Sequence, residues 1–372
     1  VYEYRYQAPK ISPEIFTLGP LSINGQDTNS IWKLASDATF QMQTGYYIGD
    51  GTDNRGITGI GFQPNLIIIK DDTSNGNEGV IWKSSVMSGE ISSKLGEGET
   101  DLATNAIQSL DSNGFTLGTE DDVNGANVRF TWVAFSGSDC TSSGTFCVGS
   151  YTGDATASRA ITTVGFQPDL VVIKRAGASN GIFRSSSMSN NVTQLFDGNV
   201  EITDGTRFKT LDSTGFTIGN NAQVNTNANT YWFFAFKNTS NAFSVGSFTG
   251  NGTDNRGITG VGFQPDYVWI KNANPVAASI ARFNLDESNS DYSGGFSDTA
   301  NTIDVVQSLD ADGFTVGANI AVNENTSTIY WIAFAGAPSQ DASGTYTMAN
   351  GSYTGNGTTQ SVSSVGFQPD LV

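Results

Sequence analysis

The chain has 372 residues, 37% hydrophobic and 11% aromatic, which is the composition of folded domains with buried cores. Only 15% are charged and the net charge is −18. Nucleic-acid and anionic-membrane binding depend on clustered Lys and Arg, so this balance argues against both partners. Histidine is absent, which excludes Ser-His-Asp and Cys-His catalysis and histidine-based metal sites. No segment approaches the roughly 20 apolar residues of a membrane-spanning helix.

The first 44 residues do not match the remainder of the chain. The chain opens on Val1 without a signal peptide, which indicates a processed protein or an excerpt of a longer one. In "VYEYRYQAP", the residues Tyr2, Tyr4 and Tyr6 alternate with Val1, Glu3 and Arg5, and Pro9 follows. This alternation predicts a β-strand at the terminus with one tyrosine-lined face. Such a strand needs a sheet to join.

Three landmarks then recur in fixed order. The tetrad G-F-Q-P begins at Gly61, Gly165, Gly262 and Gly366. "LDSNGFTLG", "LDSTGFTIG" and "LDADGFTVG" follow the first three tetrads, and an aromatic segment such as "TYWFFAF" closes each unit. The period of about 100 residues is that of a whole domain. We therefore predict units at 45–138, 149–240 and 246–337, with an incomplete fourth unit at 351–372.

Each unit is rich in strand patterns and shows no convincing helical periodicity. The apolar runs "LIIIK" and "YVWIK" are typical of strands covered on both faces, and "TYWFFAF" predicts a central buried strand. L-D-x-x-G-F-T predicts a tight hairpin with Gly at the position of positive φ. The expected fold is all-β: tandem antiparallel β-sandwiches of 7 to 9 strands, jelly-roll or lectin-like. Short connections between units predict a rod with limited bending.

Two cysteines, Cys140 and Cys147, flank "TSSGTF" between the first two units. Their proximity in a Gly/Ser-rich stretch predicts a small disulfide loop, with two inert thiols as the alternative. A loop this short stabilises the fold by only about 2.5 kcal/mol on the chain-entropy model, so it would fix a connection. The disulfide favours an oxidising, extracellular setting.

Candidate polar sites recur with the units. Without histidine, a pair of carboxylates is the remaining means of acid-base catalysis. The repeated candidates, Asp111, Asp212 and Asp310, each occupy a hairpin-turn position that favours Asp for structural reasons. We therefore expect no enzymatic activity. Three arginines, Arg55, Arg159 and Arg256, stand at one equivalent position before the second strand. Each either pairs with a nearby carboxylate in a turn or makes a polar contact to a sugar or neighbouring domain.

Calcium is the one metal for which the sequence offers ligands, and no other cofactor is expected. Oxygen ligands occur in "GDGTDNRG" from Gly49, "DESNSD" from Asp286 and "DADG" from Asp310. None of these matches a twelve-residue calcium loop, because the position after Asp50 that should carry Glu is Gly61. The second unit has "GDATASR" in place of the acidic turn, so calcium stays a weak alternative.

The fourth G-F-Q-P copy ends at Val372, partway through a strand. A fragment of this kind cannot bury Phe367 and Leu371 by itself. Either further units follow, or a strand from a neighbouring molecule completes the sheet by β-augmentation. The terminal strand with Tyr2, Tyr4 and Tyr6 is the candidate donor, and such head-to-tail contacts generate a filament.

The motif set G-F-Q-P-D-L-V-x-I-K, L-D-x-x-G-F-T-x-G and V-N-x-x-x-x-T-Y-W resembles a poorly characterised β-sandwich repeat of phage tail and other virion proteins and of large secreted bacterial surface proteins. The resemblance covers residues 45–372 and departs at "VNGANVRFTWVAF" in the first unit. It implies a non-enzymatic structural or adhesive role and supplies no catalytic residues.

The sequence therefore predicts an extracellular structural protein on a cell surface or virion. We expect it to self-associate into a fibre or filament, with strand exchange as one means of assembly. The alternative is a carbohydrate-binding adhesin, such as a phage receptor-binding tail fibre, whose partner is a cell-surface glycan. A sandwich fold alone is not evidence of sugar binding.

Overall fold

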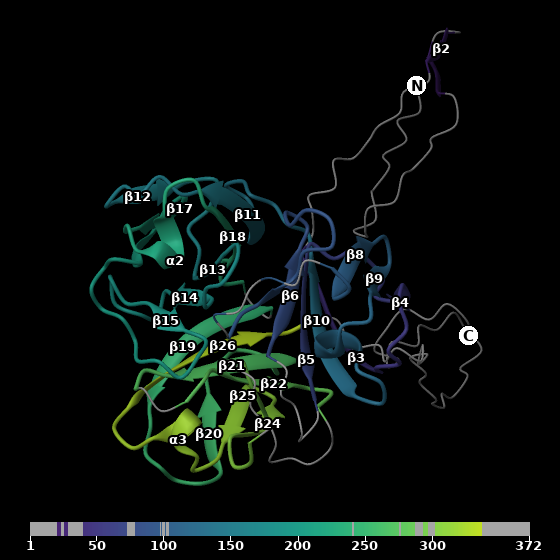
Figure 1. The fold of residues 1–372 in the computed structure, drawn as a ribbon. Coiled ribbons are helices and arrows are strands. Elements are labelled where there is room, and N and C mark those ends of the chain that lie inside the picture. Colours follow the sequence, from purple (N-terminus) through teal and green to yellow (C-terminus); the bar gives the residue numbers. More distant parts are fainter. Residues whose placement is uncertain are drawn as a thin grey trace, which may run out of the picture.

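The structure is a computed structural model that describes residues 21–23, 26–28, 40–72, 79–96, 98, 101, 104–239, 242–274, 277–286, 293–296 and 302–336. A short hairpin pairs β1 (Leu21–Ile23) with β2 (Gln26–Thr28). All other described elements belong to three similar units, which surround a common centre in Figure 1. Tyr2, Tyr4, Tyr6, Phe367 and Leu371 lie outside the described residues.

Each unit pairs a five-stranded antiparallel sheet with a three-stranded one and adds a single helical turn. In sheet order, unit 1 comprises β3 (Gln41–Ile48), β10 (Arg129–Ser136), β5 (Leu66–Asp71), β6 (Ile81–Ser84) and β7 (Ser93–Lys94), then β4 (Arg55–Thr58), β9 (Gly114–Leu117) and β8 (Ile107–Asp111), with α1 (Asp121–Asn124). Unit 2 comprises β11 (Phe146–Thr152), β18 (Thr230–Phe236), β13 (Leu170–Arg175), β14 (Ile182–Ser185) and β15 (Gln194–Leu195), then β12 (Arg159–Ile161), β17 (Gly215–Ile218) and β16 (Phe208–Asp212), with α2 (Ala222–Asn225). Unit 3 comprises β19 (Phe243–Thr249), β26 (Thr328–Phe334), β21 (Tyr267–Asn272), β22 (Ile280–Phe283) and β23 (Gly294–Gly295), then β20 (Arg256–Thr259), β25 (Gly313–Val316) and β24 (Val306–Asp310), with α3 (Ile320–Asn323).

The predicted all-β sandwich architecture is confirmed. The first and last strands of each unit pair in the larger sheet, while the second and seventh pair in the smaller. This nested pairing is that of a jelly roll, but strands three to five run on as a meander. The first strand of each unit begins three or four residues before the predicted unit start, because the strand extends ahead of the glycine taken as its beginning.

The first strand of each unit has a glycine that leaves room for an aromatic ring on the adjacent strand. A Cβ on Gly45, Gly149 or Gly246 would lie 2.1 to 2.3 Å from the ring of Trp132, Phe233 or Trp331. The predicted hairpins also form, with Asp111 opposite Gly114 in unit 1 and the equivalent pairs in units 2 and 3. Local turn and packing chemistry is thus the same in all three units.

The closing strand of each unit is buried on both faces, as predicted, but its two faces belong to different cores. In β18, Tyr231, Phe233 and Ala235 pack inside unit 2. The alternating residues, among them Phe234 and Phe236, join a central core to which all three units contribute. The larger sheets therefore face one another around the centre, and the smaller sheets cover their outer faces.

Equivalent phenylalanines from the three units meet at one end of this central core. The ring centroids of Phe135, Phe236 and Phe334 form a triangle with sides of 5.1, 5.2 and 5.0 Å. Near-equal sides are what a pseudo-threefold axis requires. The Phe40 ring lies beside this triangle, 6.2 Å from Phe135 and 6.0 Å from Phe236.

A closed cycle of six backbone hydrogen bonds joins the units elsewhere in the core. Within each unit, the residue after the fifth strand donates to the residue before the fourth: Leu95 to Val80, Phe196 to Gly181 and Phe296 to Ser279, at 3.0, 3.4 and 2.8 Å. Between units, Val80 donates to Phe296, Ser279 to Phe196 and Gly181 to Leu95, at 3.2, 2.8 and 2.9 Å. Three units complete this cycle, so the arrangement is a closed ring.

The predicted rod is therefore wrong. Short linkers fit an extended chain of domains and a ring equally well, and the shared apolar core decides between them. Each larger sheet presents a second apolar face that one unit cannot bury alone, and burial stabilises by roughly 25 cal/mol per Å² of apolar surface.

Candidate functional site

The predicted disulfide forms between Cys140 and Cys147, whose Cα atoms are 5.0 Å apart. It ties the linker between units 1 and 2 to strand β11, where Cys147 is fully buried. The linker lies over the G-F-Q-P turn of unit 2: a Cβ on Gly165 would be 2.6 Å from the Cys140 carbonyl oxygen, and one on Gly144 would be 3.2 Å from the Phe166 ring. The disulfide thus fixes a connection that covers Phe166.

The three equivalent arginines occupy the same outer turn of each unit. Arg159 lies 3.4 Å from the carboxylate of Asp154 and 5.3 Å from the centre of the Tyr151 ring, and donates to Asn225 Oδ1 at 3.3 Å. The Thr156 amide and hydroxyl donate to Asp154, and these hydrogen bonds lower its pKa to about 2. This turn is held by its own internal contacts.

The other two arginines show how far the turn is shared. Arg55 pairs with Asp50 at 3.3 Å and donates to Asn124. Arg256 donates to Asn323 at 3.1 Å, but Asn251 stands where the other units have the aspartate and Phe248 replaces the tyrosine. Among the described residues, a carboxylate partner is found for Arg55 and Arg159, whereas the turn interpretation predicted one for Arg256 as well. Arg256 has none there because Asn251 replaces the aspartate.

Each arginine donates a hydrogen bond to an asparagine side chain that the sequence analysis did not predict as a site residue. Asn124, Asn225 and Asn323 end the three helical turns and are fully buried. The Asn124 amide donates to the carbonyl oxygens of Thr52 and Gly118 at 2.9 and 2.8 Å. The signal was present as the V-N pair of the closing motif, but a four-residue helix is too short to give a helical period.

The lysine that ends the G-F-Q-P-D-L-V-x-I-K motif connects neighbouring units. Lys174 of unit 2 is fully buried, and its Nζ lies 3.4 Å from Asp101 Oδ1 of unit 1. Lys271 of unit 3 donates to the backbone carbonyl of Asp197 of unit 2. Burial lowers the pKa of both lysines, that of Lys271 to about 8. These residues help to hold the ring together.

The hairpin aspartates serve the turns in which they lie. Thr116 and Ser109 donate to Asp111 at 2.7 Å, and Asp212 and Asp310 accept from equivalent threonines. Of the calcium candidates, Asp50 accepts from Thr52, and Asp286 is directed into the interface with unit 1. Within the described part of the chain, no group of three or more His, Cys, Asp or Glu side chains could hold a metal ion.

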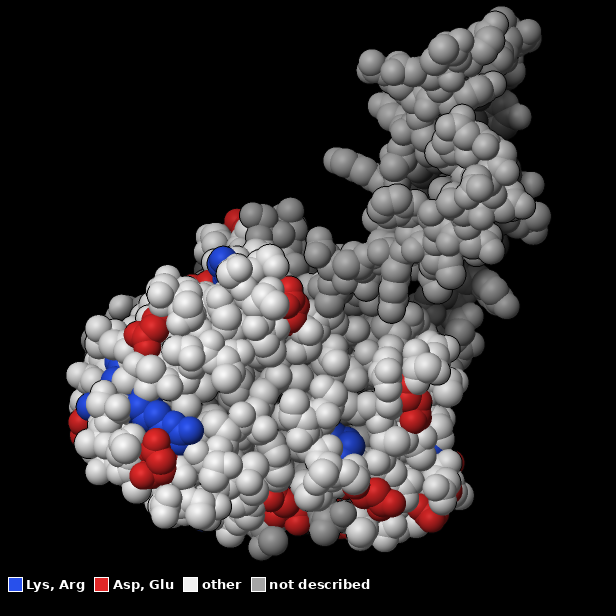
Figure 2. All heavy atoms as spheres, turned by 90° about the horizontal axis from the view of Figure 1, so that it is seen from above, with Lys and Arg blue, Asp and Glu red and all other residues white. Residues whose placement is uncertain are grey.

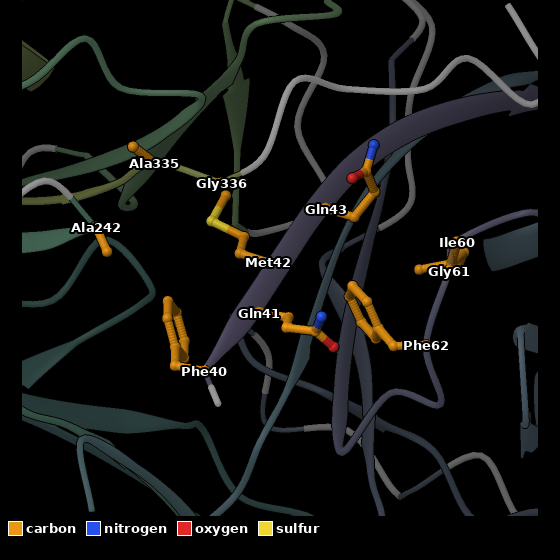
Figure 3. Close-up of a pocket in the computed structure, with 10 residues that line it drawn as sticks. All are labelled: Phe40, Gln41, Met42, Gln43, Ile60, Gly61, Phe62, Ala242, Ala335 and Gly336. Atoms are coloured by element: carbon orange, nitrogen blue, oxygen red, sulfur yellow. The ribbon is translucent and has the colours of Figure 1, made fainter. Parts of the chain in front are cut away.

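The ring has a cleft of about 360 Å³ where unit 3 meets unit 1 (Figure 3). Its lining includes Phe40, Met42 and Phe62 of unit 1 and Ala335 of unit 3, and Gln41 lies between the two phenylalanine rings. At the junction of units 1 and 2, the disulfide-bonded linker covers the equivalent G-F-Q-P turn. Ala242, from the linker between units 2 and 3, also lines the cleft.

A second recess, of about 450 Å³, lies in unit 3 and is more polar. Asp266, Arg282, Asn284, Gln264 and Gln307 contribute to its lining. Asn284 donates to Asp266 at 2.7 Å, and Gln264 donates to the Leu309 carbonyl at 3.1 Å. Burial raises the pKa of Asp266. An arginine, a carboxylate and amides around one recess are groups that can hydrogen-bond a polar ligand.

One face of the molecule carries scattered charged side chains (Figure 2). Figure 2 shows acidic and basic residues dispersed among uncharged ones on the face in view. No helix in the described ranges is both long and apolar enough to span a membrane.

A family model described as a domain of unknown function, DUF7483, matches residues 37–147, 141–247 and 238–352. The chain belongs to this family. The three matches correspond to the three units of the ring, so one DUF7483 domain is one sandwich. Neither a curated protein nor a solved structure matches the chain.

Membership in DUF7483 brings no catalytic or binding residues to the chain. Lys174 and Phe236 lie in the DUF7483 domain of unit 2 and contact neighbouring units. The disulfide loop lies where the matches of units 1 and 2 meet.

Proposed function

We propose that the chain is a structural protein of an extracellular fibre or filament, carried on a cell surface or a virion. The observation that supports this most is the closed cycle of six hydrogen bonds over a core common to three units. Such a ring makes about 300 residues into one block with little freedom between domains. A rigid block suits a part that bears load better than three hinged domains do.

Two further features favour the same proposal. The disulfide Cys140–Cys147 suits an oxidising, extracellular compartment. The motif resemblance to repeats of virion and secreted surface proteins points to the same location. Strand exchange between chain ends is one route of assembly, with Tyr2, Tyr4 and Tyr6 as the candidate donor face and Phe367 and Leu371 in the acceptor.

Electron microscopy of native material tests this proposal. We expect antibody against residues 40–336 to label fibres or particle appendages at regular intervals. Labelling confined to a dispersed monomer inside cells would contradict it. Deletion of residues 1–9 then tests the route of assembly: shorter or absent polymers support strand exchange, and unchanged polymer length excludes it.

The second candidate function is a carbohydrate-binding adhesin. It is favoured by the polar recess of unit 3, where Arg282 and Asp266 lie together. A glycan array with the full chain tests it, with Asp266→Asn as the recess variant and Asp169→Asn, the equivalent position of unit 2, as the control. Binding lost only in Asp266→Asn supports the adhesin; binding unaffected by it places the ligand elsewhere.

A further inference from the structure

The three interfaces of the ring share a plan but differ at one central position. After its fourth strand, each unit folds back so that a residue three positions later donates its amide to the last strand residue: Met87 to Ser84, Met188 to Ser185, and Asp286 to Phe283, at 3.0, 3.1 and 3.3 Å. Met87 and Met188 belong to the central core. In unit 3, a buried carboxylate stands at the position of this methionine.

The carboxylate of Asp286 has partners in both units. The amide of Phe283 donates to it at 2.8 Å, and Arg282 lies 4.0 Å away. From unit 1, the Arg129 guanidinium and the Thr131 side chain both act to lower the pKa of Asp286, against the effect of burial. A buried carboxylate with this many compensating groups can be accommodated in the interface.

Arg129 itself joins the two units. It pairs with Asp72 of unit 1 and donates to the Leu285 carbonyl of unit 3. Thr44 of unit 1 also donates to Asn284 at 3.0 Å. We call this contact between Asn284–Asp286 and the unit 1 residues Thr44, Asp72, Arg129 and Thr131 the closing interface.

The ionic residues of unit 1 have no ionic counterpart in the other units. The backbone bond from Asp72 to Arg129 is repeated as Ala176 to Thr230 and Ala273 to Thr328. Strand register also places Trp232 and Tyr330 at the position of Thr131. Asp72, Arg129 and Asp286 are thus three departures from the repeat, and all three lie at the closing interface.

The closing interface is also the one that no linker restrains. Residues 137–145 join unit 1 to unit 2, and 237–242 join unit 2 to unit 3, so those contacts form at high effective concentration. Unit 3 must find unit 1 of its own chain among similar surfaces. Exchange of equivalent elements between copies is a general hazard in this situation.

We propose that Asp72, Arg129 and Asp286 are the specificity residues that direct unit 3 to unit 1 and exclude the other DUF7483 surfaces. Against unit 2 or unit 3 of another copy, Asp286 would face Trp232 or Tyr330 in place of Thr131, and a threonine in place of Arg129. The carboxylate would then be buried without its counter-charge, which is strongly unfavourable. This inference concerns ring closure and does not rest on the proposed function.

Refolding of the full chain tests the proposal. The variant Asp72→Ala/Arg129→Thr/Asp286→Met gives the closing interface the residues found at the other two interfaces. Wild type and variant are refolded from denaturant over a hundredfold range of concentration, and light scattering after size exclusion gives the mass of each product. We expect the variant to form a several-fold larger fraction of dimers and higher oligomers, rising with concentration, because unit 3 can then pack on unit 2 or unit 3 of another chain. A wild-type distribution of products would overturn the proposal.

Two further variants keep the test decisive. Met188→Leu conserves the side-chain volume at the equivalent position of unit 2, whose neighbours are joined to it by linkers. We expect this variant to refold as the wild type does. An equal rise in oligomers for Met188→Leu would overturn the assignment to the closing interface. Asp286→Asn keeps the shape and removes the charge. If the triple variant does not refold, Asp286→Asn decides: more oligomers support the proposal, and no change overturns it.

Discussion

The two faces of each larger sheet carry similar residues but have different consequences. On β18, Phe233 packs against Phe216 of the same unit, with ring centroids 5.5 Å apart. Its neighbour Phe234 packs against Trp82 of unit 1 at 5.4 Å. Both are fully buried. One face of the sheet therefore packs inside its own domain, and the other packs against the neighbouring units of the ring. Because each unit needs its neighbours to bury this second face, the repeats depend on one another for folding.

The largest expected effect comes from separating the units. Unit 2 alone, residues 137–239, would expose the apolar face of its larger sheet, including Phe234, Phe236 and Phe183. We expect it to aggregate or to lack a cooperative unfolding transition, whereas residues 40–336 unfold cooperatively. Circular dichroism melts of the two fragments check this. A soluble, cooperatively folded unit 2 would contradict a shared core.

A double-mutant cycle compares the two faces directly. Phe234→Ala and Phe233→Ala should each lower the free energy of unfolding by roughly 3–5 kcal/mol, because each leaves a cavity. Combined with Trp82→Ala, Phe234→Ala should show a coupling of about 0.5–3 kcal/mol, because these rings touch across the interface. Phe233→Ala is the control and should be additive with Trp82→Ala. Denaturant titrations measure both; equal coupling would argue against the assignment of faces.

Removal of the disulfide tests the interface between units 1 and 2, which are joined by a linker. Cys140→Ala/Cys147→Ala should lower the free energy of unfolding by about 2.5 kcal/mol on the chain-entropy model. Chemical denaturation with and without reductant measures it, and the reduced wild type should match the variant. Because the linker covers Phe166, hydrogen exchange should increase most around the G-F-Q-P turn of unit 2. A change confined to unit 3 would contradict this role.

The smallest expected effect is a pH dependence at the closing interface. Burial raises the pKa of Asp286 from 3.8 to about 6, against the opposing influence of Arg282 and Arg129. A raised pKa means that the folded state binds the proton more tightly, so its contribution to stability is full below about pH 4 and is lost as pH rises through about 6. The melting temperature of wild type relative to Asp286→Asn should fall over this range. A difference independent of pH would contradict it.

Much of the domain could be predicted from sequence because its determinants are local. The alternation in "TYWFFAF", the apolar run before Lys271 and the Asp and Gly of each hairpin specify strands and turns directly. The same alternation indicated that both faces of β18 are buried. It could not indicate what covers the second face, because a neighbouring unit and a second sheet of the same unit require the same apolar residues.

The candidate sites were less predictable, since they depend on contacts distant in sequence. The arginine turn could be located from its repetition, and the disulfide from the spacing of Cys140 and Cys147. The partner of Lys174 is Asp101, in a different unit, and no local pattern links the two. Asp286 lay within a stretch considered for calcium, and only the arrangement of units places it against unit 1.

The central claim is that three tandem units form one closed ring. Small-angle X-ray scattering on residues 40–336 tests it most directly. A compact particle of this length has a radius of gyration of about 19 Å, whereas three such units in line would give about 30 Å. We predict a value near 19 Å with a single globular scattering profile. A value near 30 Å, with the signature of an elongated particle, would contradict the ring.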